Sequence, residues 1–437
     1  MVQDKSSPIL HIGVIGGGPG GLTATKRLTE PGSGFTCTTF EQSDNVGGTW
    51  VYTENTGHDQ YGLPVHSSMY KNLRTNLPKE IMELSGYHHK CNPDKSYITA
   101  NDVLEYLNDF ADNFNLRKYI KFRHYVNYVK PIDNNKWKVQ VRDLIHQKTV
   151  NYIFDGVMIC IGNYSNPVYP DFKGKDVCQI PIMHSHEYRT PEPFAGKRAV
   201  VVGSGPSGLD ITHDISTEAT TVFLSHHSEH VKKLRFPNNV VKKPDIAELT
   251  PTGVRFQDGS YEQVDIILYC TGYTYRYPFL HESCGINVVN KNVQPLYKHL
   301  INIEHPSMCI IGIPGDTVVF YMFDLQVRFF LQLMKGYVTL PSKAEMLADT
   351  DQDIRAHRKE SQSTHTHVMH LRSEKYLNSL ASMMRGESPV PPVLLKIYFE
   401  SFARRCEDFT AFRKDKYKII NEKMFVREPG AAKYPSK

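Results

Sequence analysis

The sequence has little of what a membrane-spanning, nucleic-acid-binding or secreted protein needs. Among its 437 residues no uninterrupted apolar stretch approaches the length of a membrane span, and residues 318–323 form one of the longest. The net charge of +5 is small for this length, and the scattered basic residues do not indicate a nucleic-acid-binding surface. The first residues, MVQDKSSPIL, lack the apolar region of a signal peptide. We therefore expect a soluble cytoplasmic protein without a membrane span, or a secreted one if a signal peptide was removed before Met1.

The eight cysteines lack the spacing that redox or metal chemistry requires. None forms a C-x-x-C pair, and the two closest, Cys270 and Cys284, are fourteen positions apart. This argues against a dithiol reductase and against a zinc site. The sequence instead predicts isolated buried thiols in a reducing compartment, and no metal site.

Glycine, in contrast, forms two fingerprints for dinucleotide binding. The first has Gly16, Gly18 and Gly21 at G-x-G-x-x-G spacing, between a β-rich run at 11–15 and a helical run at 22–28. Strand, turn and helix are the order that this motif needs, because the helix N-terminus then faces the pyrophosphate. The predicted nucleotide contacts also include the intervening residues Gly17, Pro19 and Gly20.

An acidic residue completes the first unit. Glu41 ends the next predicted strand, at residues 35–40, and stands twenty-five positions after Gly16. A carboxylate at this place can accept hydrogen bonds from both hydroxyls of an adenosine ribose. The first site therefore suits a nucleotide with a free ribose, such as FAD.

The second fingerprint differs at the same place. Its residues follow a strand predicted at 198–202 and open a helix near Leu209; they are Gly203, Ser204, Gly205, Pro206, Ser207 and Gly208. The following strand ends in Ser225, His226 and His227, with no carboxylate where Glu41 stands in the first unit. Hydroxyl and imidazole groups can bind a 2′-phosphate that a carboxylate would repel. The second site therefore suits NADP better than NAD.

A weak internal repeat indicates how the two units are arranged. Residues 155–162 and 265–272 each contain an aspartate, an apolar strand and a glycine seven positions after the aspartate, and we expect each to close a dinucleotide-binding unit. We predict an α/β fold with two doubly wound, Rossmann-like domains. Residues 1–169 would begin an FAD-binding domain, 170–280 would form a smaller inserted NADPH-binding domain, and 281–437 would complete the first with C-terminal helices.

Several motifs in order resemble the flavin-containing monooxygenases along nearly the whole chain. They are GGGPGG with Glu41, GGTW at 47–50, YKNLRTNLPKE at 70–80, HSHEY at 184–188, VGSGPSGLD at 202–210, CTGY at 270–273, and Gln326 with Gly336 and LPS at 340–342. The compact length looks more like the soluble microbial and insect members. Among these the chain looks most like the insect branch, which includes N-oxygenases that detoxify pyrrolizidine alkaloids.

The resemblance implies the chemistry. NADPH would pass a hydride to the flavin N5 atom, and the reduced flavin would react with O₂ to give a C4a-hydroperoxide. A soft nucleophilic nitrogen or sulfur atom of a small xenobiotic would then attack the distal oxygen. Since the cofactor supplies the reactive atoms, the protein needs no nucleophile or base of its own. The substrate would be a small amine or sulfide, and homo-oligomerisation stays open.

Asn76 is the candidate catalytic residue. A neutral carboxamide can both donate and accept hydrogen bonds, as flavin and nicotinamide would require; a simple turn before Pro78 is the alternative. The resemblance places further residues against the flavin, namely Gln42, Gly48, Thr49, Trp50, Thr75, Leu77, Val126 and Gln326. For Gln326, a position on the helix surface is the alternative. By the same resemblance Thr271 would contact NADPH.

The sequence also departs from the family pattern. In the motif F-x-G-x-x-x-H-x-x-x-[YF] the second half is intact, with Tyr188 four positions after His184, but Phe172 and Gly174 lie six positions too early. This leaves the role of His184 open. Tyr188 stands where Baeyer–Villiger enzymes would have tryptophan, which favours heteroatom oxygenation. His227 stands where an arginine is common, so the preference for NADPH should be weaker or more pH-dependent than usual.

Two further hypotheses stay open at this point. The chain could be a two-nucleotide oxidase or reductase that makes hydrogen peroxide without oxygenating a substrate. It could also be a flavin-binding protein that has lost turnover, since the histidine motif is interrupted.

Overall fold

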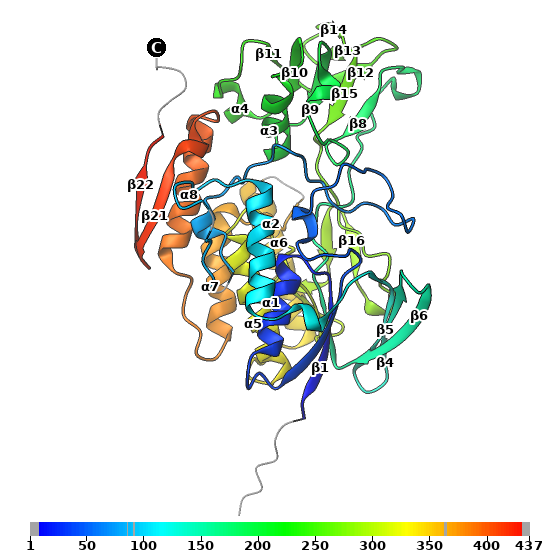
Figure 1. The fold of residues 1–437 in the computed structure, drawn as a ribbon, viewed down its shortest axis with the longest axis vertical. Coiled ribbons are helices and arrows are strands. Elements are labelled where there is room, and N and C mark those ends of the chain that lie inside the picture. The colour runs from blue at the N-terminus through cyan, green and yellow to red at the C-terminus, as the bar shows by residue number, and fades with distance from the viewer. Residues whose placement is uncertain (1–7, 85, 91, 362–364, 431–437) are drawn as a thin grey trace, which may run out of the picture.

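The fold contains two main sheets, and the first of them, a mixed sheet with a parallel centre, contains the first fingerprint (Figure 1). The computed structural model describes residues 8–84, 86–90, 92–361 and 365–430. The sheet has the order β18-β19-β20-β7-β1-β2-β3. In chain order its strands are β1 (Leu10–Ile15), β2 (Phe35–Phe40), β3 (Ile120–Lys121), β7 (Gly156–Ile159), β18 (Leu296–Tyr297), β19 (Ile301–Asn302) and β20 (Met308–Ile310).

The central strands of this sheet are apolar because both of their faces are covered. Val14 and Met158 have no exposed surface. Helix α1 (Pro19–Thr29) packs against α5 (Val319–Met334), and α5 packs against α7 (Ser373–Met383). Arg27 of α1 donates to Asp324 of α5 at 2.6 Å, so a partly buried ion pair joins helices that are nearly 300 residues apart.

The second sheet is wholly parallel and contains the second fingerprint. Its order is β11-β10-β9-β15-β8. The strands are β8 (Ile182–His184), β9 (Arg198–Val202), β10 (Thr221–Ser225), β11 (Val240–Lys243) and β15 (Ile266–Tyr269). Helix α3 (Pro206–Ile215) follows β9, and α4 (Glu229–Lys233) follows β10. An antiparallel sheet extends this unit with β12 (Ile246–Leu249), β13 (Gly253–Phe256) and β14 (Tyr261–Gln263).

Smaller elements surround the two sheets. An antiparallel sheet joins β4 (His124–Ile132), β5 (Lys136–Asp143) and β6 (Lys148–Phe154), and a hairpin joins β16 (Asn287–Val289) and β17 (Asn292–Gln294). Helix α2 (Ala100–Asn113) begins with a capping box between Thr99 and Asp102. Short 3-10 turns lie at η1 (Gly48–Trp50), η2 (Lys79–Ile81), η3 (Arg117–Tyr119), η4 (Lys175–Val177), η5 (Glu192–Phe194), η6 (Glu282–Cys284), η7 (His370–Arg372) and η8 (Phe412–Lys414).

The C-terminal segment returns to the first sheet, and its last described elements form a hairpin. Its helices are α6 (Lys343–Ser361), α7 and α8 (Pro392–Glu407), and the hairpin joins β21 (Lys416–Asn421) to β22 (Met424–Glu428). In Figure 1 the hairpin lies beside α8, at the left edge of the molecule. This return places η8 close to the loop at 74–76 and to helix α3.

The architecture confirms the predicted α/β fold with two Rossmann-like units. Strands of the first sheet come from both sides of the second in the sequence, so the first unit is discontinuous. The exact domain boundaries at 169 and 280 stay a prediction. No helix among the described residues is long and apolar enough to cross a membrane.

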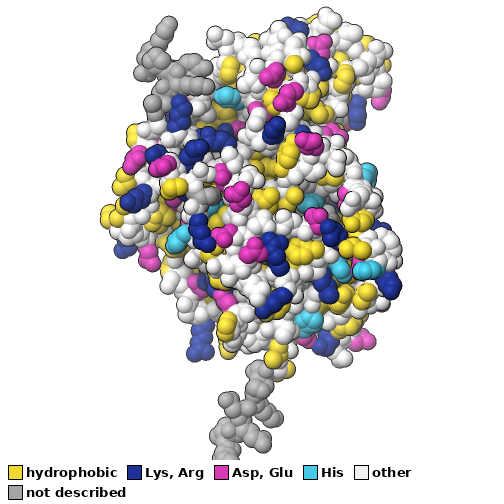
Figure 2. Space-filling model, viewed as in Figure 1, with side chains coloured by type: hydrophobic (Ala, Val, Ile, Leu, Met, Phe, Trp, Pro, Cys, Tyr) yellow, Lys and Arg dark blue, Asp and Glu magenta, His cyan; other side chains and the backbone are white. Residues whose placement is uncertain are grey.

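The cysteines agree with the expectation of isolated thiols. The described ones are all free, and five are buried, namely Cys37, Cys160, Cys270, Cys284 and Cys309. Cys91 and the ends at 1–7 and 431–437 lie outside the described residues. On the face in Figure 2, basic and acidic side chains are interspersed, as the mild net charge predicts.

Candidate functional site

The first fingerprint forms a tight turn that only glycine can make. Gly16 has φ +108°, and a Cβ there would lie 2.4 Å from the carbonyl oxygen of Cys160. A Cβ on Gly21 would lie 1.8 Å from the carbonyl oxygen of Gly16. The first glycine therefore permits the turn, and the third lets α1 approach β1 closely.

The start of α1 provides a cradle for a phosphate group. Gly18 is the N-cap, and no described side chain caps the helix, so the amides of Gly20 and Gly21 face outward from its first turn. Pro19 occupies a position where the helix needs no N–H group. Gly18 packs closely against Gly48, whose Cβ would meet the Gly18 Cα at 3.0 Å. A pyrophosphate fits this turn, because free backbone amides can bind its oxygens and no described side chain blocks its approach.

Glu41 lies at the end of β2, as predicted, and is 4 % exposed. Its Oε2 accepts from the amide of Gly17 at 2.6 Å, and its Oε1 accepts from the amide and the hydroxyl of Ser43, both at 2.8 Å. These bonds fix the carboxylate beside the turn. A carboxylate has about four acceptor positions, so acceptor capacity remains for a ribose. Gln42, the next residue, contacts His66 through its side chain at 2.9 Å.

The GGTW segment lies against the same turn. The amide of Gly47 donates to the carbonyl of Gly17 at 3.1 Å, and Gly48 has φ +56°. The 3-10 turn η1 therefore brings Thr49 and Trp50 next to the fingerprint. Ser67 donates to the carbonyl of Thr49 at 3.0 Å and holds the turn from outside.

The loop that contains Thr75, Asn76 and Leu77 is anchored from two sides. The Thr75 amide donates to the carbonyl of Ile98 at 2.9 Å, and Thr75 is buried. Leu77 packs against the hydrophobic core. The Oδ1 of Asn76 accepts from the Nη2 of Arg413 at 2.7 Å.

The contact with Arg413 fixes which way the Asn76 carboxamide points. Arginine has donors and no acceptor, so the atom that faces it must be the amide oxygen. The Nδ2 group of Asn76 then points elsewhere, and no acceptor among the described residues binds it. The side chain is therefore oriented with its NH₂ group free to donate. The sequence predicted that it could both donate and accept, but in the structure the acceptor oxygen is already bound by Arg413.

Two of the residues predicted to contact the flavin are buried in the core. Val126 is a buried residue of β4 and belongs to the core cluster of Ile15 and Phe40. Gln326 has no exposed surface, so it does not lie on the helix surface. Its Oε1 accepts from the amide of Gly312 at 2.8 Å and its Nε2 donates to Tyr376 at 2.7 Å. The carboxamide of Gln326 is therefore already bound on both sides.

The second fingerprint repeats the geometry of the first. Gly203 has φ +103°, and its Cβ would lie 2.6 Å from the carbonyl oxygen of Cys270; a Cβ on Gly208 would lie 2.0 Å from the oxygen of Gly203. Gly205, in contrast, has φ −67°, and no described atom lies within 4 Å of its Cβ position. No described side chain caps α3, which begins at Pro206 and Ser207 after the loop residue Ser204. A second pyrophosphate fits this open turn.

The last residue of β10 and the two that follow it differ in exposure and in their partners. Ser225 is buried and its hydroxyl donates to the carbonyl of Pro244 at 3.0 Å. His226 is buried, and its Nδ1 has no partner. His227 is exposed, and its Nδ1 lies 3.1 Å from the carboxylate of Asp245. The second site therefore has a carboxylate beside His227. The sequence did not predict it, because Asp245 does not follow β10, as Glu41 follows β2, but follows the neighbouring strand β11.

Buried polar atoms without partners cluster at the carboxyl ends of the second sheet. His184 ends β8 and Tyr269 ends β15, and both the Nε2 of His184 and the Oη of Tyr269 are buried and unpartnered. Burial, together with the nearby His186, lowers the pKa of His184 to about 4, so its imidazole is neutral at pH 7. Thr271 follows at the same edge and donates to the carbonyl of Val168 at 2.5 Å. Ligands of open parallel sheets bind at this edge, so the unpartnered atoms fit a polar ligand.

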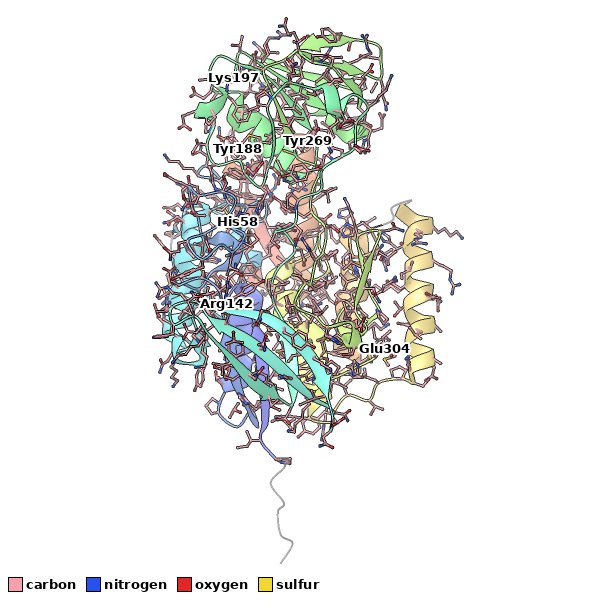
Figure 3. All side chains as sticks on the ribbon, turned by 90° about the vertical axis from the view of Figure 1, so that its right-hand side faces the viewer. His58, Arg142, Tyr188, Lys197, Tyr269 and Glu304 are labelled. Atoms are coloured by element: carbon pink, nitrogen blue, oxygen red, sulfur yellow. The ribbon has the colours of Figure 1, made fainter. Side chains whose placement is uncertain are left out.

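Two functional candidates were missed by the sequence argument. Asp210 follows the second fingerprint and binds both Tyr70 and Arg413, the latter at 2.5 Å. Arg413 lies in η8, close to the C-terminal hairpin. The motif VGSGPSGLD contains Asp210 and could have suggested it, whereas nothing in the sequence around Arg413 indicated a site. Figure 3 shows Tyr188 and Tyr269 on the side of the second unit where it meets the first.

A family profile and curated relatives match most of this chain. The profile of the flavin-binding monooxygenase-like family matches residues 10–232 and 232–400. Senecionine N-oxygenase of Tyria jacobaeae is 32% identical over 434 residues, which cover 97% of this chain and 93% of that protein. Flavin-containing monooxygenase FMO GS-OX5 of Arabidopsis thaliana is 36% identical over 357 residues, 78% of this chain and 77% of that one.

Solved structures agree in fold. S-allyl-L-cysteine S-oxygenase from Allium sativum superimposes with a TM-score of 0.85 at 30% identity, covering 93% of this chain and 95% of that chain. Tmm from Pelagibacter sp. superimposes with a TM-score of 0.84 at 25% identity, covering 96% of each chain. The similarity therefore includes both sheets and the segments that join them.

Proposed function

Because this chain belongs to the flavin-containing monooxygenase family, whose cofactors are FAD and NADPH, we propose that it N-oxygenates small tertiary amines of the pyrrolizidine-alkaloid type. The observation that carries the proposal is the pair of glycine turns without side-chain caps in one chain, with a buried carboxylate, Glu41, bound to the backbone of the first turn. Two such turns suit a resident flavin and a second nucleotide that reduces it.

The residues of the first unit would hold FAD. The amides of the first fingerprint, at 16–21, would bind its pyrophosphate and Glu41 its adenosine ribose; Gln42, Gly48, Thr49, Trp50 and the loop at 75–77 would line the rest. Val126 and Gln326 would support this wall from the core, since both are buried. When bound, FAD supplies the chemistry that accepts a hydride and activates O₂, which no side chain can do.

The residues of the second unit would hold NADPH. The second fingerprint, at 203–208, would bind the pyrophosphate, and Thr271 would lie at the nicotinamide end. Ser225, His226 and His227 would surround the 2′-phosphate, because His226 has an unpartnered buried nitrogen there. The Asp245 carboxylate beside His227 opposes a 2′-phosphate, so the preference for NADPH over NADH should be modest.

Asn76 would act as a hydrogen-bond donor to the reacting region. Its oxygen is occupied by Arg413, so its Nδ2 is the atom available to cofactor or substrate. The remaining role of the chain is to exclude water around the reacting atoms. The side chains of Tyr70 and Tyr188 support that role, because both are buried and their ring centroids lie 5.5 Å apart between the two units.

The substrate class is the finer part of the proposal. The similarity to senecionine N-oxygenase, which covers 97% of this chain, supports an amine substrate. The similarity to an S-oxygenase of known structure, at 30% identity, supports a sulfide instead, so the test compares the two. The test is to supply purified FAD-loaded protein with NADPH, O₂ and either senecionine or a dialkyl sulfide of similar size. We expect N-oxide as the main product. S-oxide formation with no N-oxide would reject the amine assignment, and hydrogen peroxide with neither product would reject the oxygenase.

A further inference from the structure

Helix α3 presents two carboxylates, one turn apart, to the first unit. Asp210 and Asp214 have i, i+4 spacing and so lie on one face of the helix. Asp214 accepts from Asn72 at 2.9 Å and from Tyr188 at 2.6 Å. Asp210 accepts from Tyr70 through one oxygen and from Arg413 at 2.5 Å through the other. The helix that begins at the second fingerprint is thereby tied to the loop around Asn76.

Arg413 is the group that joins the two sites. Its Nη1 donates to Asp210 of α3, while its Nη2 donates to the side chain of Asn76 at 2.7 Å. The same guanidinium also donates to the carbonyls of Thr75 at 3.1 Å and Arg74 at 3.3 Å. Its side chain is only 16% exposed. A guanidinium is planar and its donors keep a fixed geometry, so a shift of one partner displaces the others.

The last residues of the second fingerprint and Asp210 lie on the same helix, α3. Gly205 is the N-cap residue of α3 and has no side chain to cap it, and Asp210 lies five positions further, less than two turns along the same helix. A nucleotide that binds the uncapped N-terminus therefore acts on the helix that holds Asp210. Packed side chains tend to switch between discrete arrangements. A small shift of α3 can therefore move Arg413, and with it the Asn76 carboxamide that Arg413 binds.

We propose that Arg413 is a positioning residue that couples nucleotide binding at the second fingerprint to the orientation of Asn76 at the first. This coupling rests on the proposed function, since it assigns Asn76 and the two nucleotides to their sites. Arg413 itself touches neither nucleotide in this proposal. It acts through Asp210 on one side and Asn76 on the other, and it sets the donor orientation of the Asn76 amide.

Three variants distinguish two roles for these contacts: coupling nucleotide binding to Asn76, or only holding the two units together. R413K keeps a positive charge for Asp210 but has one point-like donor group, so it cannot bridge Asp210, Asn76 and the loop carbonyls together. D210N removes the ionic contact from the other end. D214N is the control, because Asp214 docks the same face of α3 without touching Arg413 or Asn76.

The test uses the FAD-loaded protein and follows the visible flavin spectrum while NADP⁺ is added without substrate. In the wild type, NADP⁺ should perturb the flavin spectrum. R413K and D210N should each lower the amplitude of this change at saturation at least threefold, with unchanged FAD content. The amplitude in the double variant should be no lower than in the single variant with the smaller amplitude. D214N should keep the wild-type amplitude.

Three results would overturn the coupling. They are a wild-type amplitude in R413K, an equal loss in D214N, and a wild-type flavin spectrum that NADP⁺ leaves unchanged although it binds. Binding itself is measured independently by calorimetry. The spectral readout needs no oxygenated product, so a protein that makes none would reject the proposed function while this readout still decides the coupling.

Discussion

The Nη2 of Arg413 donates to the Oδ1 of Asn76 at 2.7 Å, although 337 positions separate the two residues in the chain. Since arginine can only donate, this single contact orients the carboxamide and leaves its Nδ2 as the available donor. The proposed catalytic residue is therefore held by a segment close to the C-terminal hairpin and not by its own loop alone.

Replacing Asn76 with aspartate should separate orientation from donation. N76D keeps an oxygen for Arg413 and removes the amide donor, whereas N76A removes both. We expect both variants to lower the ratio of oxygenated product to NADPH consumed by about tenfold or more, because a lost donor in a dry site has effects of that order. FAD content, measured by absorbance after denaturation, is the control. A fully coupled N76D would show that the amide donor has no role.

Alanine at Gly205 should weaken nucleotide binding without harming the fold. The Cβ would enter open space at an ordinary φ of −67°, so the free protein can accommodate it, but a pyrophosphate approaching the turn would meet it. We expect the KM for NADPH to rise about tenfold, the equivalent of about 1.4 kcal/mol. The matched variant G208A should fail to fold, because its Cβ would lie 2.0 Å from the oxygen of Gly203. An unchanged KM in G205A would place the pyrophosphate elsewhere.

The pair of His227 and Asp245 should set the choice between NADPH and NADH. H227A removes a group that can bind the 2′-phosphate, and we expect the ratio of kcat/KM for NADPH to that for NADH to fall several-fold. D245N removes a carboxylate 3.1 Å from His227 and should raise the same ratio several-fold, since like charges no longer oppose each other. If neither substitution moves the ratio, the 2′-phosphate does not bind beside His227.

Glu80 should make stability fall as pH rises. Burial raises the pKa of this carboxyl from 4.5 to about 7. A raised carboxyl pKa contributes stability that is complete below the unfolded value near 4.5 and is lost as pH rises toward 7 and above. The loss amounts to about 3 kcal/mol at most. E80Q stays neutral and can keep the bond from Ser96, so its melting temperature should depend less on pH between 5 and 8. Parallel pH curves for E80Q and the wild type would contradict this.

The local parts of both sites could be predicted from the sequence because their chemistry lies within short segments. The strands before Gly16 and Gly203, the turns and the helices after them follow from apolar runs and glycine spacing. Glu41 was predicted at the end of β2 and lies beside Gly17. Each of these relations depends on fewer than thirty residues of chain.

The long-range parts could not be predicted in the same way. Asp245 reaches His227 because β11 pairs with β10, and that pairing is a property of the sheet order. Gln326 is buried because α5 packs against α1 and α7, which no single helix pattern determines. The contact of Arg413 with Asn76 requires the whole C-terminal segment to return to the loop at 74–76. Tertiary packing, and not local propensity, decides these three placements.

The measurement that tests the central claim most directly is the origin of the oxygen atom in the product. Purified FAD-loaded protein is supplied with NADPH, a tertiary-amine substrate and ¹⁸O₂, and the product is analysed by mass spectrometry alongside the amount of NADPH consumed. We predict one ¹⁸O atom in each product molecule and close to one product per NADPH. NADPH consumption that yields only hydrogen peroxide, or a product whose oxygen comes from water, would contradict the assignment of this protein as an oxygenase.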